Sequence, residues 1–288
     1  MSETSLVALG HQSWMVEHGG TRVLVDPMLL ESFGTHEDLR FVVYPHRRVC
    51  AAEMPPIDAV LLTNEHLDHF HLPSLALLDR GVLVVVGTLM PDCVVEAIGR
   101  LGLRVARITS GQPLRVGALE LRVYQSTRES MFWEKRVYNA LVGPPGRPGV
   151  FFQSDAVVSR GFTDEVAAGR VPCPRCLVVT NNAQIVPPGA RGTFDNMLPS
   201  AEDRRRGSAP LRALHEVVVR YTEALPASDV VIHGGGYLRP RSSFGPYAFS
   251  DHREVARLLS SLSMGTRIHG LDPGEHLEFA ADTRRGQV

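Results

Sequence analysis

The residues with the clearest potential for chemistry crowd into one short segment, residues 64–71. It contains three imidazoles and two carboxylates, contributed by Glu65, His66, Asp68, His69 and His71. Imidazole and carboxylate are the nitrogen and oxygen ligands that proteins use for zinc, iron and manganese. A lone surface histidine is usually solvated, but this density of ligand groups predicts a metal site.

The elements on either side of this segment indicate how its side chains are positioned. The apolar run Ala59–Leu62 predicts a short buried strand. Pro73, whose fixed φ suits a first helical turn, predicts a helix that continues to Leu78. The ligand groups therefore lie on a tight strand-to-helix loop, which can direct them toward a common point.

At these residues the chain resembles the metallo-β-lactamase-fold superfamily, whose signature is H-x-H-x-D-H at the end of a buried strand. The corresponding segment here is Asn64-Glu65-His66-Leu67-Asp68-His69. Asn64 stands where the first histidine belongs, and its amide oxygen is a weaker ligand than imidazole. The arrangement is more similar to the lactonase-like and phospholipase-like branches than to the lactamases that degrade antibiotics.

The resemblance implies an α/β fold, a four-layer αββα sandwich of the metallo-β-lactamase type. The order of the predicted elements agrees, because strand patterns at 81–86 and 103–108 alternate with a helical pattern at 94–101. A hairpin around Gly117 then precedes further strand patterns, at 137–142, 150–152, 176–180 and 229–232. Nothing suggests a linker, so we expect a single domain over residues 1–288.

The resemblance implies two further ligands, because the family places them directly after later core strands. Asp155 follows the strand pattern at 150–152 and matches an aspartate that can bridge two metal ions. His233 follows the strand pattern at 229–232 and matches the family's final histidine. Asp26 resembles a carboxylate that orients a metal ligand, and a turn residue before Pro27 is the alternative interpretation.

The third histidine of the family's first metal site has no counterpart, because no histidine occurs between His71 and His215. Glu129 is an oxygen ligand that would substitute for it, and a solvated loop charge is the alternative interpretation. The first ligand set is therefore reduced to His66. We expect one tightly held ion, Zn²⁺ or Fe²⁺, and a second ion that is weak or absent.

The complete prediction for the site assigns a role to each of these residues. The predicted metal ligands are His66, Asp68, His69, Asp155 and His233. Asp68 or Asp155 would also accept a proton from water as the general base. Substrate contacts are assigned to Asn64, Arg128 and Tyr237, of which the arginine suits an anionic group.

Three functions are compatible with this ligand set. The leading hypothesis is a metal-dependent hydrolase acting on an ester, lactone, amide or phosphodiester. Two histidines and a carboxylate also describe non-haem iron oxygenases, and the resemblance extends to relatives that bind iron. The third hypothesis is a non-catalytic binding protein whose site has degraded, which the replacement at Asn64 would permit.

Composition narrows the remaining possibilities. The chain has 30 basic and 31 acidic residues and no long basic run, so nucleic acid is not a favoured partner. Its longest apolar run is too short for a membrane span, and its first residues do not resemble a signal peptide. The 4 cysteines suggest a reducing compartment. We expect a cytoplasmic protein with a small-molecule substrate, chosen by loops at 31–56 and 187–207.

Overall fold

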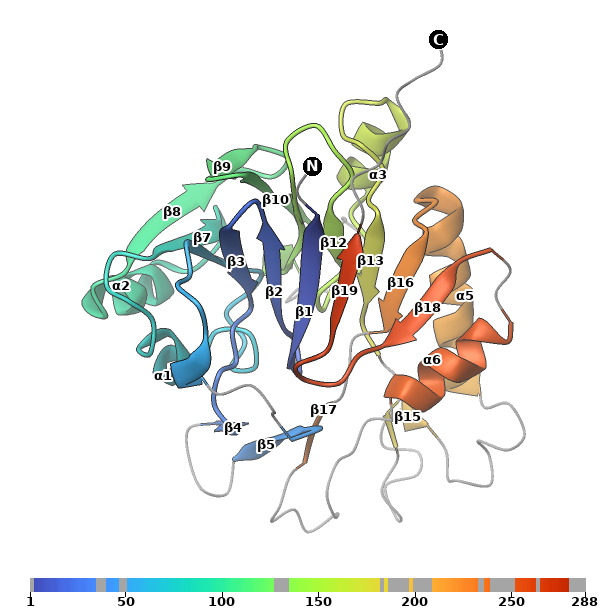
Figure 1. Cartoon of the computed structure of the whole chain (residues 1–288), viewed down its shortest axis with the longest axis horizontal. Helices are drawn as coiled ribbons and strands as arrows, with labels where there is room; N and C mark the ends of the chain where they lie inside the picture. The colour runs from blue at the N-terminus through green and yellow to red at the C-terminus, as the bar shows by residue number, and fades with distance from the viewer. Residues whose placement is uncertain are drawn as a thin grey trace.

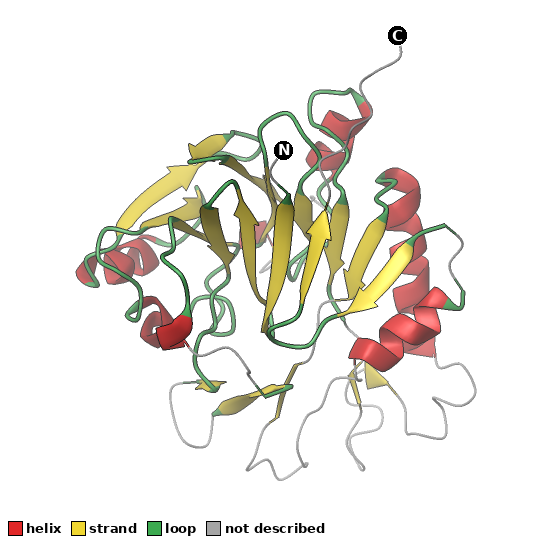
Figure 2. Ribbon diagram, viewed as in Figure 1, coloured by secondary structure: helices red, strands yellow, loops and turns green. Residues whose placement is uncertain are grey.

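The structure is a computed structural model, which describes residues 3–34, 40–46, 51–126, 135–181, 184–185, 197–198, 209–232, 236–238, 252–262 and 265–279. Two seven-stranded β-sheets pack face to face at its centre, and helices lie on both outer faces (Figures 1 and 2). This arrangement confirms the predicted α/β class and the αββα layers.

The strands of the two sheets come from both halves of the chain. In spatial order, the first sheet consists of β19 (His276–Phe279), β1 (Thr4–Gly10), β2 (Ser13–His18), β3 (Thr21–Val25), β6 (Ala59–Leu62), β7 (Leu83–Gly87) and β8 (Arg104–Ile108). The second sheet consists of β18 (Arg267–Gly270), β16 (Asp229–Ile232), β13 (Cys176–Val179), β12 (Val150–Phe152), β11 (Tyr138–Gly143), β10 (Leu119–Gln125) and β9 (Leu114–Val116).

The described helices and the short strands complete the structure. The α-helices are α1 (Leu72–Leu75), α2 (Asp92–Arg100), α3 (Arg160–Ala167), α5 (Ala209–Ala224) and α6 (His252–Ser260), and a 3₁₀ turn spans Ala51–Glu53. The short strands are β4 (Ser32–Phe33), β5 (Phe41–Tyr44), β14 (Gln184–Ile185), β15 (Met197–Leu198) and β17 (Gly236–Leu238). No helix in the described part of the chain is long and apolar enough to cross a membrane.

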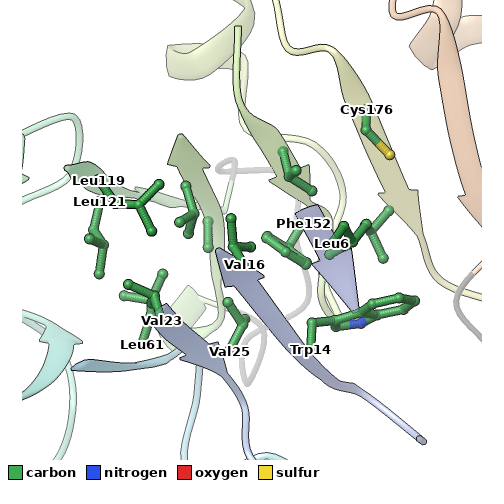
Figure 3. Close-up of a cluster of buried hydrophobic side chains, with 14 of the residues drawn as sticks. Leu6, Trp14, Val16, Val23, Val25, Leu61, Leu119, Leu121, Phe152 and Cys176 are labelled. Carbon is green, nitrogen blue, oxygen red and sulfur yellow. The ribbon is translucent and has the colours of Figure 1, made fainter. Parts of the chain in front are cut away.

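Apolar side chains hold the four layers together in three clusters. Between the sheets, Trp14 and Phe152 face each other with ring centroids 6.4 Å apart, among the aliphatic residues drawn in Figure 3. A second cluster lies under α1 and α2 and includes Ile98. The third lies under α3, α5 and α6, where Phe162 stacks on Phe151 at 4.2 Å. Removing this apolar surface from water is the main force that fixes the strand register.

The direction of the strands determines where functional loops gather. In the first sheet β3, β6, β7 and β8 are parallel, and in the second sheet β12, β13, β16 and β18 are parallel. Parallel strands end at the same edge of a sheet, so the loops after β3, β6 and β12 collect there. The two edges meet, because a 2.7 Å hydrogen bond joins the hydroxyls of Thr63 and Ser154. In Figure 1, β4, β5 and β17 lie below the sandwich, beyond this edge.

Several boundaries differ from the sequence prediction. The helix predicted to reach Leu78 ends at Leu75, and i→i+3 hydrogen bonds at Leu77 and Leu78 continue the chain as tight turns. Gly81, with φ +85°, then precedes β7. The predicted loop at 31–56 contains β4, β5 and the 3₁₀ turn. Neither α3 nor β18 was predicted, because both are short and partly polar.

A charged cluster joins the starts of β16 and β18 in the second sheet. Asp229 at the start of β16 accepts two hydrogen bonds of 2.8 Å from the Arg267 guanidinium, and His269 Nε2 lies 2.9 Å away. Burial raises the pKa of Asp229, but hydrogen bonds from Arg267 and His269 outweigh it and lower the pKa from 3.8 to about 2. The ionised carboxylate therefore stabilises the fold at neutral pH.

This cluster predicts a pH-dependent loss of stability in Asp229→Asn. Because the folded pKa is depressed, the stabilisation is present above the unfolded pKa and disappears as pH falls from 3.8 toward about 2. We expect the variant to lose about 1–2 kcal/mol of unfolding free energy near neutral pH. The loss is limited because the Arg267 guanidinium is 64% exposed, so solvent partly screens the pair. The difference, measured by urea denaturation, should shrink below about pH 4.

The control is Asp92→Asn, whose carboxylate is 92% exposed beside Arg107 and should contribute almost nothing. A difference between wild type and Asp229→Asn that stays constant down to about pH 3 would contradict the role of the ionised carboxylate.

Candidate metal centre

Four chain segments meet where the edges of the two sheets come together. They are the β1–β2 turn (residues 10–13), Asp26 after β3, the loop after β6 (residues 63–71), and Ser154–Asp155 after β12. The first three belong to the first sheet and the last belongs to the second sheet. Their polar side chains contact one another directly.

His69 is the centre of these contacts, and its ring is completely buried. Its Nδ1 lies 2.8 Å from Asp26 Oδ2, and its Nε2 lies 2.8 Å from Asp155 Oδ2. Asp68 Oδ2 lies 3.8 Å from the same Nε2. Both ring nitrogens therefore face carboxylates, as a protonated imidazole requires. If a cation replaced the proton on Nε2, the hydrogen bond from Nδ1 to Asp26 would keep the ring in the tautomer whose Nε2 is a ligand.

Asp26 is itself held by the residue that follows β6. It is 2% exposed and accepts hydrogen bonds from the Thr63 amide (2.8 Å) and the Thr63 hydroxyl (2.6 Å). The Ser154 hydroxyl then donates to Thr63 Oγ1 at 2.7 Å. The predicted role of Asp26, orienting a ligand, agrees with this geometry.

Hydrogen bonds to Gln153 fix the loop of the second sheet that carries Asp155. Asn139 Nδ2 donates to the Gln153 carbonyl at 2.6 Å, and the Thr180 amide donates to Gln153 Oε1 at 3.2 Å. Gln12 Nε2 donates to Asp155 Oδ1 at 2.9 Å, which leaves Oδ2 facing the imidazoles.

His66 lies at the exposed side of the cluster. Its Nδ1 is 3.9 Å from Asp155 Oδ2, and 39% of its side chain is exposed. Glu65 turns away from the cluster and pairs with Arg136 at 2.7 Å, which anchors the loop. His66 therefore has the freedom to approach a bound group, whereas His69 does not.

The backbone around the cluster is strained. Among the described residues, the non-glycine residues with positive φ are His11 (+50°), Asp26 (+46°) and Ser154 (+57°). All three contact the cluster or precede a member of it, since His11 Nε2 lies 3.0 Å from Asp68 Oδ2. Strain of this kind persists only where the surroundings impose it, and it concentrates at functional sites.

The protonation of the cluster reflects its crowded carboxylates. Burial lowers the pKa of His69, but the Asp155, Asp26 and Asp68 carboxylates outweigh it, so this pKa is raised well above 6.5. Burial raises the pKa of Asp68, but His69 and His11 hold it below 3.8. The nearby Asp155 carboxylate raises the pKa of His66 despite its partial burial. The site attracts positive charge.

These groups fit a divalent cation. One ligand atom each from His66, Asp68 and Asp155 lie within 4.8 Å of one another, and His69 Nε2 adjoins both carboxylates. Imidazole nitrogen with carboxylate oxygen is a donor set that suits zinc, iron or manganese. The sequence prediction therefore brought together four groups that the structure also places together.

Asn64 has a structural use in the loop. Its side chain is fully buried, its Oδ1 accepts the His66 amide at 2.8 Å, and its Nδ2 donates to Thr63 Oγ1 at 3.2 Å. Both polar groups of the amide are thus occupied within the loop. The predicted contact of Asn64 with substrate stays a prediction.

Other predicted site residues lie outside the described residues. These are His233, Arg128 and the alternative ligand Glu129. Tyr237 belongs to β17, which pairs with β5, but its side chain is not described. Their predicted roles stay predictions.

Sequence reasoning missed Gln12, Thr63 and Ser154. Each is a common polar residue at a strand end, and no motif marks it. The signal that would have found them is three-dimensional, because each contacts a carboxylate or hydroxyl more than ten residues away.

Comparisons with known proteins agree with this architecture. The family model for the β-lactamase superfamily domain matches residues 5–142. A UPF0173 metal-dependent hydrolase from Aeropyrum pernix is 22% identical over 282 residues, which are 95% of this chain and 97% of that protein.

Solved structures extend the likeness in fold to the whole chain. An isothiocyanate hydrolase from Delia radicum gut bacteria has a TM-score of 0.63 at 15% identity, covering 96% of this chain and 98% of that one. The diiron β-hydroxylase CmlA from Streptomyces venezuelae has a TM-score of 0.59 at 18% identity, covering 96% of this chain and 54% of that one.

The hydrogen-bond network predicts that the Thr63 hydroxyl stabilises the site. In Thr63→Val, Asp26 Oδ2 loses a 2.6 Å donor and Ser154 loses a 2.7 Å partner, both in a buried setting. We expect a loss of about 1–3 kcal/mol of unfolding free energy, measured by urea denaturation. Thr63→Ser keeps the hydroxyl and should lose much less. A loss in Thr63→Val no larger than in Thr63→Ser would contradict a dominant role for the hydroxyl, because Thr63→Val keeps the methyl group and removes only the hydroxyl.

Proposed function

We propose that this chain, whose residues 5–142 match the β-lactamase superfamily domain, is a metal-dependent hydrolase with one tightly held ion. The observation that carries the proposal is the convergence of two carboxylates from different sheets on one buried imidazole. Asp155 Oδ2 lies 2.8 Å and Asp68 Oδ2 lies 3.8 Å from His69 Nε2. Carboxylates held this close repel each other unless positive charge lies between them. Protonated His69 supplies part of that charge, and a divalent ion would supply more of it.

The proposed ligands are Asp68, His69 and Asp155, with His66 at the exposed side. His233, which follows β16 directly in the sequence, is a further proposed ligand. Asp26 supports this assignment, because it occupies His69 Nδ1 and leaves Nε2 for the ion. A divalent ion held there supplies Lewis acidity toward a carbonyl or phosphoryl oxygen and makes bound water more acidic. The relative from Aeropyrum pernix, named a metal-dependent hydrolase, supports the same proposal.

The chain's own carboxylates have the protonation that the reaction needs. The pKa of Asp68 is lowered, because His69 and His11 outweigh the effect of burial, so this side chain is ionised at neutral pH. An ionised Asp68 or Asp155 accepts a proton from water as general base. His66 is partly exposed at the same side, where an ester, lactone, amide or phosphodiester can approach.

The geometry of Asn64 favours one ion over two. In the family's first metal site this position supplies an imidazole, but here the amide is buried and bonded within the loop. That site would retain only His66 among the described residues, and one imidazole is too few for tight binding.

A second candidate function is oxygen chemistry at a non-haem iron ion. The carboxylate-rich donor set favours it, because two histidines with a carboxylate suit iron as well as zinc. CmlA, described as a diiron β-hydroxylase, shows that the fold can carry such chemistry in another protein. Zinc with intact hydrolysis supports the first candidate, whereas iron with substrate-dependent oxygen uptake supports the second.

Elemental analysis of the purified protein tests the proposed site. We expect about one ion per chain in the wild type, and occupancy reduced about tenfold or more in His69→Ala and Asp155→Ala, since each removes a ligand. His276→Ala is the control, because its side chain is 56% exposed at the start of β19. Wild-type metal content in both ligand variants, with the fold intact by circular dichroism, would refute the assignment.

A further inference from the structure

The turn between β1 and β2 reaches both carboxylates of the centre with two adjacent residues. His11 Nε2 lies 3.0 Å from Asp68 Oδ2, and Gln12 Nε2 donates to Asp155 Oδ1 at 2.9 Å. Asp68 belongs to the loop of the first sheet and Asp155 to the loop of the second sheet. One short turn therefore contacts both sides of the centre.

The shape of this turn is unfavourable for its sequence. His11 has φ +50° and Gly10 has φ +101°, and a side chain at Gly10 would meet Pro273 Cγ at 3.2 Å. Histidine tolerates the left-handed region better than most residues, but it still costs free energy there. The strained conformation directs the His11 ring inward, where it is 4% exposed and stacks on Phe33 at 5.6 Å.

The two contacts offset the repulsion between the two carboxylates of the centre. Asp68 and Asp155 carry like charges and repel each other, which by itself raises the pKa of Asp68. A donor on each carboxylate offsets this repulsion without adding a further negative group. The donor on Asp155 Oδ1 also fixes the carboxylate, so that Oδ2 faces His66 and His69.

We propose that His11 and Gln12 are positioning residues that hold Asp68 and Asp155 in the geometry for one divalent ion. They act through hydrogen bonds to the ligands, and the ion does not bind to His11 itself. The proposal rests on the proposed function, since it assumes that both carboxylates are ligands. Donors to ligating groups typically change metal affinity by about 10–100-fold when they are removed.

The test measures zinc affinity by competition with a chromophoric chelator, independently of any hydrolysis. In His11→Gly the donor is lost without backbone strain, because glycine accepts a positive φ. In Gln12→Leu the donor is lost without adding a charge. We expect affinity to fall about 10–100-fold in both variants. In His11→Gln the amide restores a donor, and affinity should return to within about threefold of wild type, because amide is a poor zinc ligand but a good donor.

Each result has a defined meaning when thermal unfolding of the metal-free proteins shows that all variants fold. If wild type does not bind zinc, the proposed function itself fails. If wild type binds zinc and the variants bind it equally, only the present proposal is overturned. If His11→Gln loses affinity as fully as His11→Gly, His11 acts as a ligand and the positioning role is wrong.

Discussion

The buried imidazole of His69 is the constraint around which the functional edge is built. It contacts Asp26 and Asp155 at 2.8 Å each, and Asp68 lies 3.8 Å away, so three carboxylates surround one ring. A buried charge of either sign is costly unless it is paired, so these groups must be placed together or not at all. The pairing also joins the two sheets, because Asp155 comes from the second sheet and its partners come from the first. Fold and site are thus coupled by one set of contacts.

The sandwich supplies the rigidity that this arrangement needs. Strands of both sheets are buried between apolar clusters, and the loops that carry the site follow directly from these strands. The strained residues His11, Asp26 and Ser154 lie at the ends of such strands. Packing around the strands offsets the free-energy cost of their positive φ. The hydrogen bonds that start at Thr63 and Asn139 then fix the loops that carry the carboxylates. If the proposed groups bind a cation, they are already held in place and would lose little further entropy.

Sequence reasoning predicted most of the fold because the core strands are apolar and the helices keep a helical period. The segment at 59–69 pointed to the candidate site, since its ligand types are dense and follow a buried strand. Asp155 was found through the order of elements that the family shares. The supporting residues were not predicted, because Gln12 and Thr63 act through contacts with residues far away in the sequence. The same limit applies to Asn64, whose buried amide completes the loop and whose use could not be inferred from the motif. The domain organisation, with one domain over the whole chain, stays a prediction.

The central claim is that the front and back halves of the chain share one cation at the edge of the sandwich. Anomalous diffraction from crystals of the metal-loaded protein, collected on both sides of the absorption edge of the ion, tests it most directly. The account predicts a single strong peak within bonding distance, about 2.0–2.2 Å, of the carboxylates of Asp68 and Asp155 and of His69 Nε2. A peak bound only by residues of one sheet, or none between these carboxylates, would contradict it.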